Sequence, residues 1–306
     1  MITRQEALDF VESHLKIENP SEKFHENRLA FLNSLIEAYQ YNVPFHNITL
    51  LCLDKEQRRA PSKEEIEQNA LTTIGGLCLE NNAAFHFILE SIGFDVNFIS
   101  ARVINPNDHC LSIANNVVSD GDQFLVDVGF GYPSFQAIPL DFKQESPIYC
   151  HSCCKYKFVR KEDVIERQHL RTVKKDMWET DKLVPENSTG VWRHSYNFKL
   201  TPVDFSCYGA AMNNIYTIPS CSRFLVSLRV ITFPNGKCIS LKDNSLLTEG
   251  DDKCLHETLL KSVAEMKGWI LKLCPQISPV KIEKALNYWE KEIMPTLKTE
   301  AGPGQI

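Results

Sequence analysis

The chain has 306 residues and a formal net charge of −6, and at about 150 residues per domain this length predicts roughly two structural units. Hydrophobic residues make up 43% and charged residues 24% of the sequence, a balance that excludes an intrinsically disordered or fibrous protein. The longest basic run is Lys174-Lys175. We therefore expect neither nucleic acid nor an anionic membrane surface as a partner.

The sequence carries no sign of export or membrane insertion. Residues 1–8 lack the apolar core of a signal peptide, and no apolar run approaches about 18 residues. A cytoplasmic protein is expected, in which the 11 scattered cysteines remain thiols. Asn47 and Asn187 begin matches to the glycosylation pattern, which we interpret as chance.

Helical periodicity runs through the first 95 residues. Apolar residues recur with helical spacing over residues 8–15 and 29–39. A capping-box pattern at Ser62-Lys-Glu-Glu65 predicts the start of a third helix. A fourth helix fits residues 79–92, with Gly93 as its left-handed stop.

From about residue 98 the sequence changes to short runs rich in Val, Ile and Phe, which are typical of strands. The predicted strands are 98–104, 111–118, 123–128, 156–160, 197–200, 224–232 and 237–241, the last two joined by a turn at 234–236. Residues 161–195 are charged and poorly patterned, and we interpret them as an excursion from the sheet. Helices are predicted again at about 254–272 and 280–292. This order of elements predicts an α+β fold.

The strongest candidate for chemistry is Gly75-Gly76-Leu77-Cys78, where two glycines permit a tight turn and a cysteine follows as a helix begins. A helix N-terminus favours negative charge, so a thiol there loses its proton more easily and becomes a nucleophile. The first backbone N–H groups of the helix can also stabilise an oxyanion. The alternative is a buried, inert core thiol.

Two further residues could complete a catalytic group. His109 lies between a turn and the strand that begins at Leu111, and Asp127 interrupts an apolar run. A carboxylate in an apolar strand costs several kcal/mol unless it has a partner, and an imidazole N–H would serve. Cys78, His109 and Asp127 would then be nucleophile, base and orienting group. The alternatives are a surface turn histidine and an aspartate in a turn at a strand end.

These residues resemble the arylamine N-acetyltransferase family. The family's Arg-Gly-Gly-x-Cys-x-(Glu/Gln)-x-Asn pattern matches Gly75, Gly76, Cys78, Glu80 and Asn82. Its Val-Pro-Phe-x-Asn pattern matches Val43 to Asn47. Residues 126–131, 196–200 and 242–244 resemble further conserved segments of the family. Ile74 replaces the family's arginine before the glycines. If that arginine supports the active-site loop, this chain must either replace the support or have a looser site. Leu77 stands where many relatives carry an aromatic residue.

The resemblance implies acetyl-CoA-dependent N-acetylation of arylamines and arylhydrazines and O-acetylation of arylhydroxylamines, in xenobiotic metabolism. In the implied ping-pong mechanism Cys78 takes the acetyl group, His109 handles protons, and Asp127 fixes the histidine tautomer.

The resemblance also implies binding residues. Gly129 and Phe130 would line the acyl pocket and contact the cofactor, Phe45 and Phe130 would contact the aromatic amine, and Thr217 would lie near CoA. For Phe45 and Phe130 the alternative is ordinary core packing, and for Thr217 it is a plain loop.

The implied architecture is a helical bundle over 1–95 with the nucleophile, an antiparallel β-barrel over 96–215 with His109 and Asp127, and an α/β lid over 216–306. These units surround a Cys-His-Asp core like that of thiol proteases, in an expected monomer. No metal is expected, because the Cys and His cluster at 150–154 lacks the second half of a zinc site. Two alternatives stay open: a thiol hydrolase or amidase with the same triad, and a non-catalytic relative that binds aromatic amines or CoA.

Overall fold

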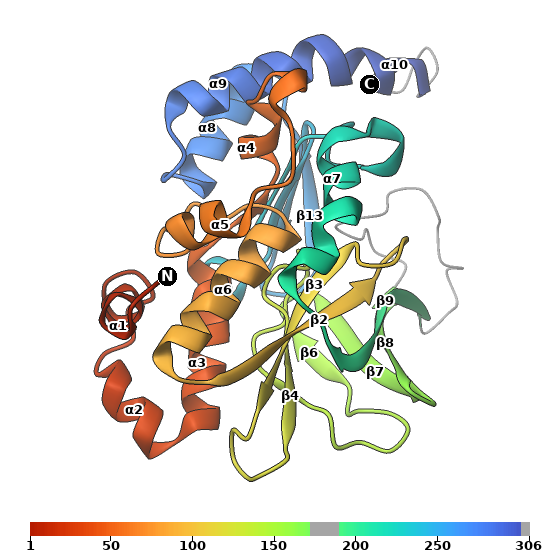
Figure 1. Ribbon diagram of the computed structural model, residues 1–306. Helices are drawn as coiled ribbons and strands as arrows, with labels where there is room; N and C mark the ends of the chain where they lie inside the picture. Colours follow the sequence, from red (N-terminus) through yellow and green to blue (C-terminus); the bar gives the residue numbers. More distant parts are fainter. Residues whose placement is uncertain (172–189, 301–306) are drawn as a thin grey trace.

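The computed structural model describes residues 1–171 and 190–300 (Figure 1). Its helices are α1 (Arg4–Ser13), α2 (Pro20–Glu26), α3 (Arg28–Asn42), α4 (Ile48–Leu51), α5 (Lys63–Asn69), α6 (Cys78–Ile92), α7 (Gly209–Thr217), α8 (Val263–Leu273), α9 (Pro279–Tyr288) and α10 (Met294–Glu300). Its strands are β1 (Phe45–His46), β2 (Asp95–Arg102), β3 (His109–Asn115), β4 (Gln123–Val126), β5 (Ile138–Pro139), β6 (Tyr149–His151), β7 (Cys154–Lys161), β8 (Val164–Arg171), β9 (Val191–Pro202), β10 (Arg229–Thr232), β11 (Ile239–Lys242), β12 (Ser245–Glu249) and β13 (Leu255–Leu259).

The helical N-terminal part follows the sequence signals closely. The Ser62 side chain accepts a hydrogen bond from the backbone of Glu65, whose carboxylate accepts one from the backbone of Ser62, so the predicted capping box starts α5. Helix α6 ends at Gly93, which has a φ of 114° in the left-handed region. Most of α6 is buried, because it lies between α1 and α5 and the strands β2 and β3 (Figure 1).

Two antiparallel sheets follow. The larger has eight strands in the order β5-β4-β3-β2-β9-β8-β7-β6, and the smaller has five in the order β1-β10-β11-β12-β13. The molecule is a mixed α+β fold whose larger sheet curls into a half-barrel (Figure 1). In the described residues the expected barrel is therefore open, with β5 and β6 at its two edges.

The structure corrects the interpretation of residues 161–195 as an excursion. Residues 164–171 form β8, a full strand that pairs with β7 and β9. Its buried positions alternate, but three of the four are filled by Arg167, His169 and Arg171 rather than by apolar side chains. The usual apolar signal of a strand is therefore missing. Residues 172–189 of the predicted excursion lie outside the described residues.

The helix predicted over 254–272 starts later than expected. Residues 255–259 form β13, which pairs with β12 at the edge of the smaller sheet. Helix α8 begins after Ser262, whose side chain accepts a hydrogen bond from the backbone of Glu265. The turn at 234–236 joins β10 to β11 as predicted.

Residues 45–47 connect the N-terminal helices to the smaller, five-stranded sheet, which we call the C-terminal sheet. Strand β1 pairs with β10, and the fully buried Asn47 follows it. The Asn47 amide donates to the carbonyls of Phe224 (2.7 Å) and Ser227 (2.6 Å) and accepts from the backbone of Arg229 (2.8 Å). This burial rules out glycosylation at Asn47 in the folded chain, while Asn187 lies outside the described residues.

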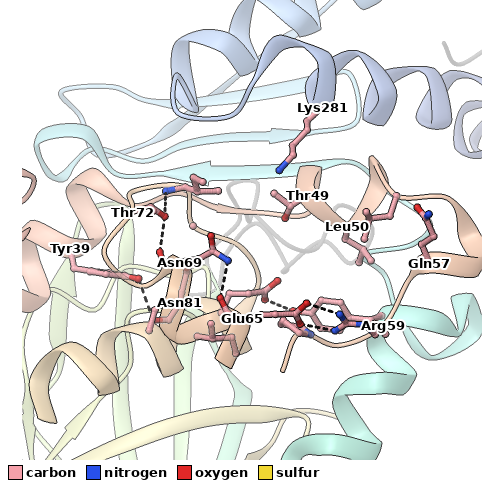
Figure 2. Close-up of a pocket in the computed structure, with 18 residues that line it drawn as sticks. Tyr39, Thr49, Leu50, Gln57, Arg59, Glu65, Asn69, Thr72, Asn81 and Lys281 are labelled. Carbon is pink, nitrogen blue, oxygen red and sulfur yellow. Dashed lines mark hydrogen bonds and ion pairs between the residues drawn. The ribbon is translucent and has the colours of Figure 1, made fainter. Parts of the chain in front are cut away.

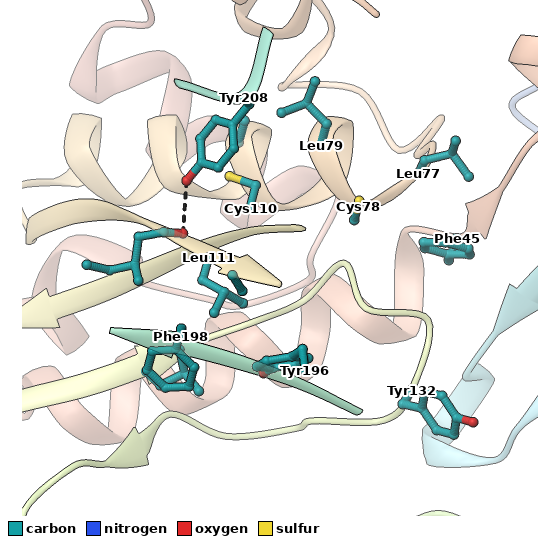
Figure 3. Packing of buried hydrophobic residues seen from close by; sticks show 14 of the residues in the cluster. Phe45, Leu77, Cys78, Leu79, Cys110, Leu111, Tyr132, Tyr196, Phe198 and Tyr208 are labelled. Atoms are coloured by element: carbon teal, nitrogen blue, oxygen red, sulfur yellow. Dashed lines mark hydrogen bonds between the residues drawn. The ribbon is translucent and has the colours of Figure 1, made fainter. Parts of the chain in front are cut away.

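A continuous apolar core lies beneath the start of α6 (Figure 3). Cys78, Cys110, Tyr196 and Tyr208 are among its members. Tyr208 is buried, and its hydroxyl donates to the carbonyl of Ile99 at 2.9 Å. The polar end of this ring therefore has a hydrogen-bond partner inside the core. All eleven cysteines are free thiols.

We expect Asn47→Ala to lower the free energy of unfolding by about 2–4 kcal/mol, because it removes the hydrogen bonds that the buried amide makes to two carbonyls and one backbone N–H. The matched control is Asn42→Ala, since Asn42 is exposed and its amide bonds only the carbonyl of Ala38. Urea denaturation measures both variants. Equal stability of the two variants would contradict the role given to Asn47.

Candidate active site

Cys78 and His109 line one cavity of about 520 Å³. Helix α6 contributes Cys78, β3 contributes His109, and the loop after β4 contributes Phe130. Asp127 lies behind the cavity wall, directly after β4. Residues that are far apart in sequence thus meet where the helical bundle joins the half-barrel.

Cys78 is the first residue of α6, and its side chain is largely buried. Its thiol lies 3.9 Å from the carbonyl oxygen of Asp108. Burial raises the pKa of the Cys78 thiol well above its usual value, and the nearby charges of Glu80, Asp108 and Asp127 add to this rise. The sequence led us to expect that the helix N-terminus would favour a thiolate at Cys78. The position at the helix start is not sufficient for this, and ionisation of the thiol needs a positively charged partner.

The turn before His109 is folded around a carboxylate. Asp108 accepts hydrogen bonds from the backbone N–H groups of Val103 (2.7 Å), Ile104 (2.8 Å) and Asn105 (2.7 Å). The predicted turn is therefore present and rigidly bonded. It fixes the backbone from which His109 enters β3.

His109 and Asp127 form a buried pair, as the sequence predicts. The His109 Nε2 lies 3.2 Å from the Asp127 Oδ2, and both side chains are almost fully buried. Burial raises the pKa of Asp127, but the charge and hydrogen bond of His109, the hydrogen bond of Asn82 and the charge of Arg167 outweigh it, so this pKa lies below its usual value. Asp127 is thus held as a carboxylate beside the imidazole.

Asn82 connects this pair to the helix that carries Cys78. Its amide nitrogen donates to Asp127 Oδ1 (2.9 Å) and to the carbonyl of Cys110 (2.7 Å), and its oxygen accepts from the backbone of Val128 (2.8 Å) and Gly129 (2.9 Å). Its position one turn after Cys78 was the sequence signal that could have revealed this role.

Two glycines are required by close contacts at the site. Gly75 has a φ of 75°, and a Cβ there would lie 2.0 Å from the carbonyl oxygen of Pro44. A Cβ at Gly129 would lie about 3 Å from the Asn82 amide and the Cys78 carbonyl. Gly129 therefore packs behind Cys78 and is not among the residues that line the cavity.

The loop before Cys78, which carries Ile74 where the resemblance would place an arginine, is held by His46. The buried His46 ring donates through Nε2 to the Ile74 carbonyl at 2.9 Å and accepts through Nδ1 from the backbone of Ile48 at 3.1 Å. The backbone of His46 also donates to the carbonyl of Gly76 at 2.9 Å. The Ile74 side chain packs against the C-terminal apolar cluster.

Aromatic rings form the walls of the cavity. Phe45 lines it and lies 5.8 Å from the ring of Phe224, and Phe130 lies 5.2 Å from the His109 ring. The buried Arg167 guanidinium lies 5.1 Å from the Phe130 ring and supports it from behind. Sequence reasoning missed Arg167, because a basic residue in a charged segment is normally solvent-exposed.

Like Gly129, Thr217 does not line the Cys78 cavity. Its hydroxyl donates to the carbonyl of Asn213 at 2.7 Å. It lines a smaller recess with Lys55, Arg58 and Tyr288 rather than the Cys78 cavity. The segment 221–224, just after Thr217, does line the Cys78 cavity.

The part of the chain that the structure describes contains neither a metal-binding group nor a membrane-spanning helix. Within 1–171 and 190–300 no three His, Cys, Asp or Glu side chains are grouped to hold a metal ion. In the same ranges no helix combines the length and apolarity needed to cross a membrane.

Comparison of the sequence with known proteins gives a consistent family. A family model described as N-acetyltransferase matches residues 28–273. A pineal gland isozyme of arylamine N-acetyltransferase from Gallus gallus is 29% identical over 129 residues, which cover 38% of this chain and 43% of that protein. A second pineal gland isozyme from Gallus gallus is 26% identical over 222 residues, covering 67% of this chain and 72% of that protein.

Solved structures share the fold. The arylamine N-acetyltransferase of Mycobacterium abscessus superimposes with a TM-score of 0.73 at 18% identity, over 95% of this chain and 98% of that one. The Mycobacterium marinum arylamine N-acetyltransferase, solved in complex with CoA, gives a TM-score of 0.69 at 17% identity, over 90% and 96% of the two chains.

We expect Asp127→Asn to slow alkylation of Cys78 by iodoacetamide at pH 7 at least about tenfold, because His109 loses the anion that favours its protonated form. Peptide mass spectrometry reports Cys78 separately from the other ten thiols. The control is Asp120→Asn, a matched change at an exposed turn position. Equal alkylation rates in the two variants would show that Asp127 does not act on Cys78 through His109.

His46 makes the fold acid-sensitive. Burial lowers the pKa of His46 to about 4, although its bond to the Ile74 carbonyl acts the other way. In the unfolded chain the pKa is about 6.5. The unfolded state therefore binds more protons across this window, and stability falls as pH is lowered from about 6.5 toward 4.

We expect His46→Gln to be less stable than the wild type at pH 7 but to lose about 1–2 kcal/mol less between pH 6.5 and 5. Urea denaturation at the two pH values measures this difference. Some slope will remain, because burial lowers the pKa of His86 to about 3 as well. An unchanged slope in the variant would show that His46 is not the titrating group.

Proposed function

The chain belongs to the arylamine N-acetyltransferase family, and from this premise we propose that it transfers the acetyl group of acetyl-CoA to arylamines through an acetyl-Cys78 intermediate. The observation that carries the proposal is the buried His109–Asp127 pair, 3.2 Å apart, beside the cavity into which Cys78 opens. This arrangement supports a Cys-His-Asp core like that of thiol proteases.

Thiolate formation is the first requirement. Because burial disfavours an isolated thiolate at Cys78, the proton must move to a base that stays nearby as a cation. His109 meets this need, since Asp127 binds its Nε2 and leaves Nδ1 to receive the thiol proton. Asp127 then stabilises the imidazolium and fixes the tautomer of the neutral ring.

Acetyl transfer follows in two steps, first to Cys78 and then to the amine. The Cys78 sulfur attacks the thioester carbonyl, the C–S bond to CoA breaks, and His109 returns its proton to the departing CoA sulfur. The amine nitrogen then attacks the acetyl-Cys78 carbonyl, gives its proton to His109, and leaves as the amide, while the thiol is restored. The backbone N–H of Cys78, at the helix start, would stabilise the oxyanion in both steps.

The cavity walls support an aromatic acceptor and a short acyl group. Phe45 and Phe130 would contact the amine, and Phe130 would also limit the acyl chain beside His109. Gly129 would act by letting this loop approach Cys78 closely. CoA in the Mycobacterium marinum neighbour supports acetyl-CoA as the donor here. Contact between Thr217 and CoA stays a prediction.

The wider role is part of the same proposal. Arylamines, arylhydrazines and arylhydroxylamines are the proposed acceptors, which places the protein in xenobiotic metabolism. A monomeric, cytoplasmic enzyme stays our prediction.

We expect double-reciprocal plots of CoA release at varied acetyl-CoA and fixed arylamine concentrations to give parallel lines, because CoA leaves before the amine binds. Cys78→Ser should lose essentially all turnover, whereas Cys150→Ser, at an exposed thiol, should retain it. Steady CoA release without amine would instead indicate a hydrolase, and intersecting lines would exclude the ping-pong order.

A further inference from the structure

One arginine lies in the core behind the wall of the Cys78 cavity. Arg167, on β8, is among the largest fully buried side chains of the protein. It does not line the cavity, but its Cζ lies 5.1 Å and 5.7 Å from the ring centres of Phe130 and Tyr132, which do. No step of the proposed acetyl transfer uses this guanidinium.

Four aromatic rings surround the Arg167 guanidinium. Besides Phe130 and Tyr132, the ring of Tyr156 on β7 lies 4.4 Å from its Cζ, and that of Tyr196 on β9 lies 5.9 Å from it. The rings also contact one another, since Phe130 stacks on Tyr132 at 5.3 Å and meets Tyr196 edge-on at 4.9 Å. The guanidinium is therefore the centre of an aromatic cluster that includes part of the cavity wall.

The Arg167 guanidinium lacks the hydrogen bonds that a buried cation normally has. Neither of its terminal nitrogens, Nη1 and Nη2, has a hydrogen-bond partner among the described residues. Arg59 shows the ordinary arrangement at a second cavity of about 560 Å³, where its two terminal nitrogens donate to the Glu65 carboxylate at 2.6 Å each (Figure 2). A buried cation without such bonds is costly, and an apolar side chain would fill the same space without that cost.

The attraction between the cation and the ring faces is what holds this cluster together. Cation–π attraction is stronger where both partners are removed from water, as they are around Arg167. It acts on Phe130 and Tyr132 from the side opposite the cavity, and it restrains both rings at once. Since positions that break a local packing rule are often functional, we looked for the consequence in the cavity wall.

We propose that Arg167 determines the specificity of the Cys78 cavity: its guanidinium clamps Phe130 and Tyr132 by their ring faces and so limits the size of the group that reaches Cys78. Phe130 is the decisive ring, because it lies 5.2 Å from the ring of His109. Without the clamp, Phe130 can recede toward β8 and admit a larger group. The consequence for acyl transfer, a preference for acetyl over longer acyl groups, rests on the proposed function.

Alkylation of Cys78 tests the clamp without any acyl-CoA. Iodoacetamide is the small reagent and N-phenyliodoacetamide the large one, and peptide mass spectrometry gives the rate at each thiol relative to the exposed Cys150. We expect Arg167→Met to raise the ratio of large-reagent to small-reagent rates at Cys78 at least about tenfold. Arg167→Lys keeps a cation among the rings and should raise it much less. The matched control, Arg59→Met at the exposed ion pair, should leave it unchanged.

Two buried thiols report whether each variant is folded. Cys110 and Cys274 have no exposed surface, and both should stay unreactive. With these thiols protected, an unchanged ratio in Arg167→Met, or equal ratios in Arg167→Met and Arg167→Lys, would overturn the proposal. If Arg167→Met exposes Cys110, the lysine variant decides alone: a ratio near that of the wild type supports the clamp, and a tenfold increase refutes it.

The same variants test the consequence for acyl transfer. We expect the ratio of kcat/KM for butyryl-CoA to that for acetyl-CoA to rise at least about tenfold in Arg167→Met and to stay constant in Arg59→Met. An altered alkylation ratio with an unaltered acyl-CoA ratio would overturn the role in specificity. Absence of acyl transfer in the wild type would instead contradict the proposed function, and the alkylation rates would still decide whether the clamp exists.

Discussion

The burial of the Asp127 carboxylate is the constraint on which the site depends. A charge in the core of a protein needs hydrogen bonds and a counter-charge, and Asp127 obtains them from Asn82 and His109. Because Asn82 lies one turn after Cys78 on α6, satisfying Asp127 also fixes the helix that carries the nucleophile. One buried anion thus sets the relative positions of three elements: α6, β3 and the loop after β4.

The remainder of the fold holds the start of α6 from the opposite direction. His46 and the backbone around it bind the loop that precedes Cys78, and Asn47 ties the same segment to the C-terminal sheet. The position of Cys78 therefore reflects contacts from all three parts of the chain.

The sequence predicted the elements whose signals are local. The start of α5 at Ser62, the end of α6 at Gly93 and the meeting of His109 with Asp127 all follow from capping, glycine conformation and the cost of a buried charge. It failed for β8, because Arg167 and His169 occupy buried positions, where they lie against the rings of Tyr156 and Tyr132. The displaced position of Thr217 depends on tertiary contacts, which no local pattern encodes.

Intact mass after mixing the protein with acetyl-CoA, in the absence of amine, tests the central claim most directly. The account predicts a gain of one acetyl group, about 42 Da, that is absent in Cys78→Ala and is removed when an arylamine is added. An unmodified mass, in a protein whose Cys78 still reacts with iodoacetamide, would contradict acetyl transfer through this residue.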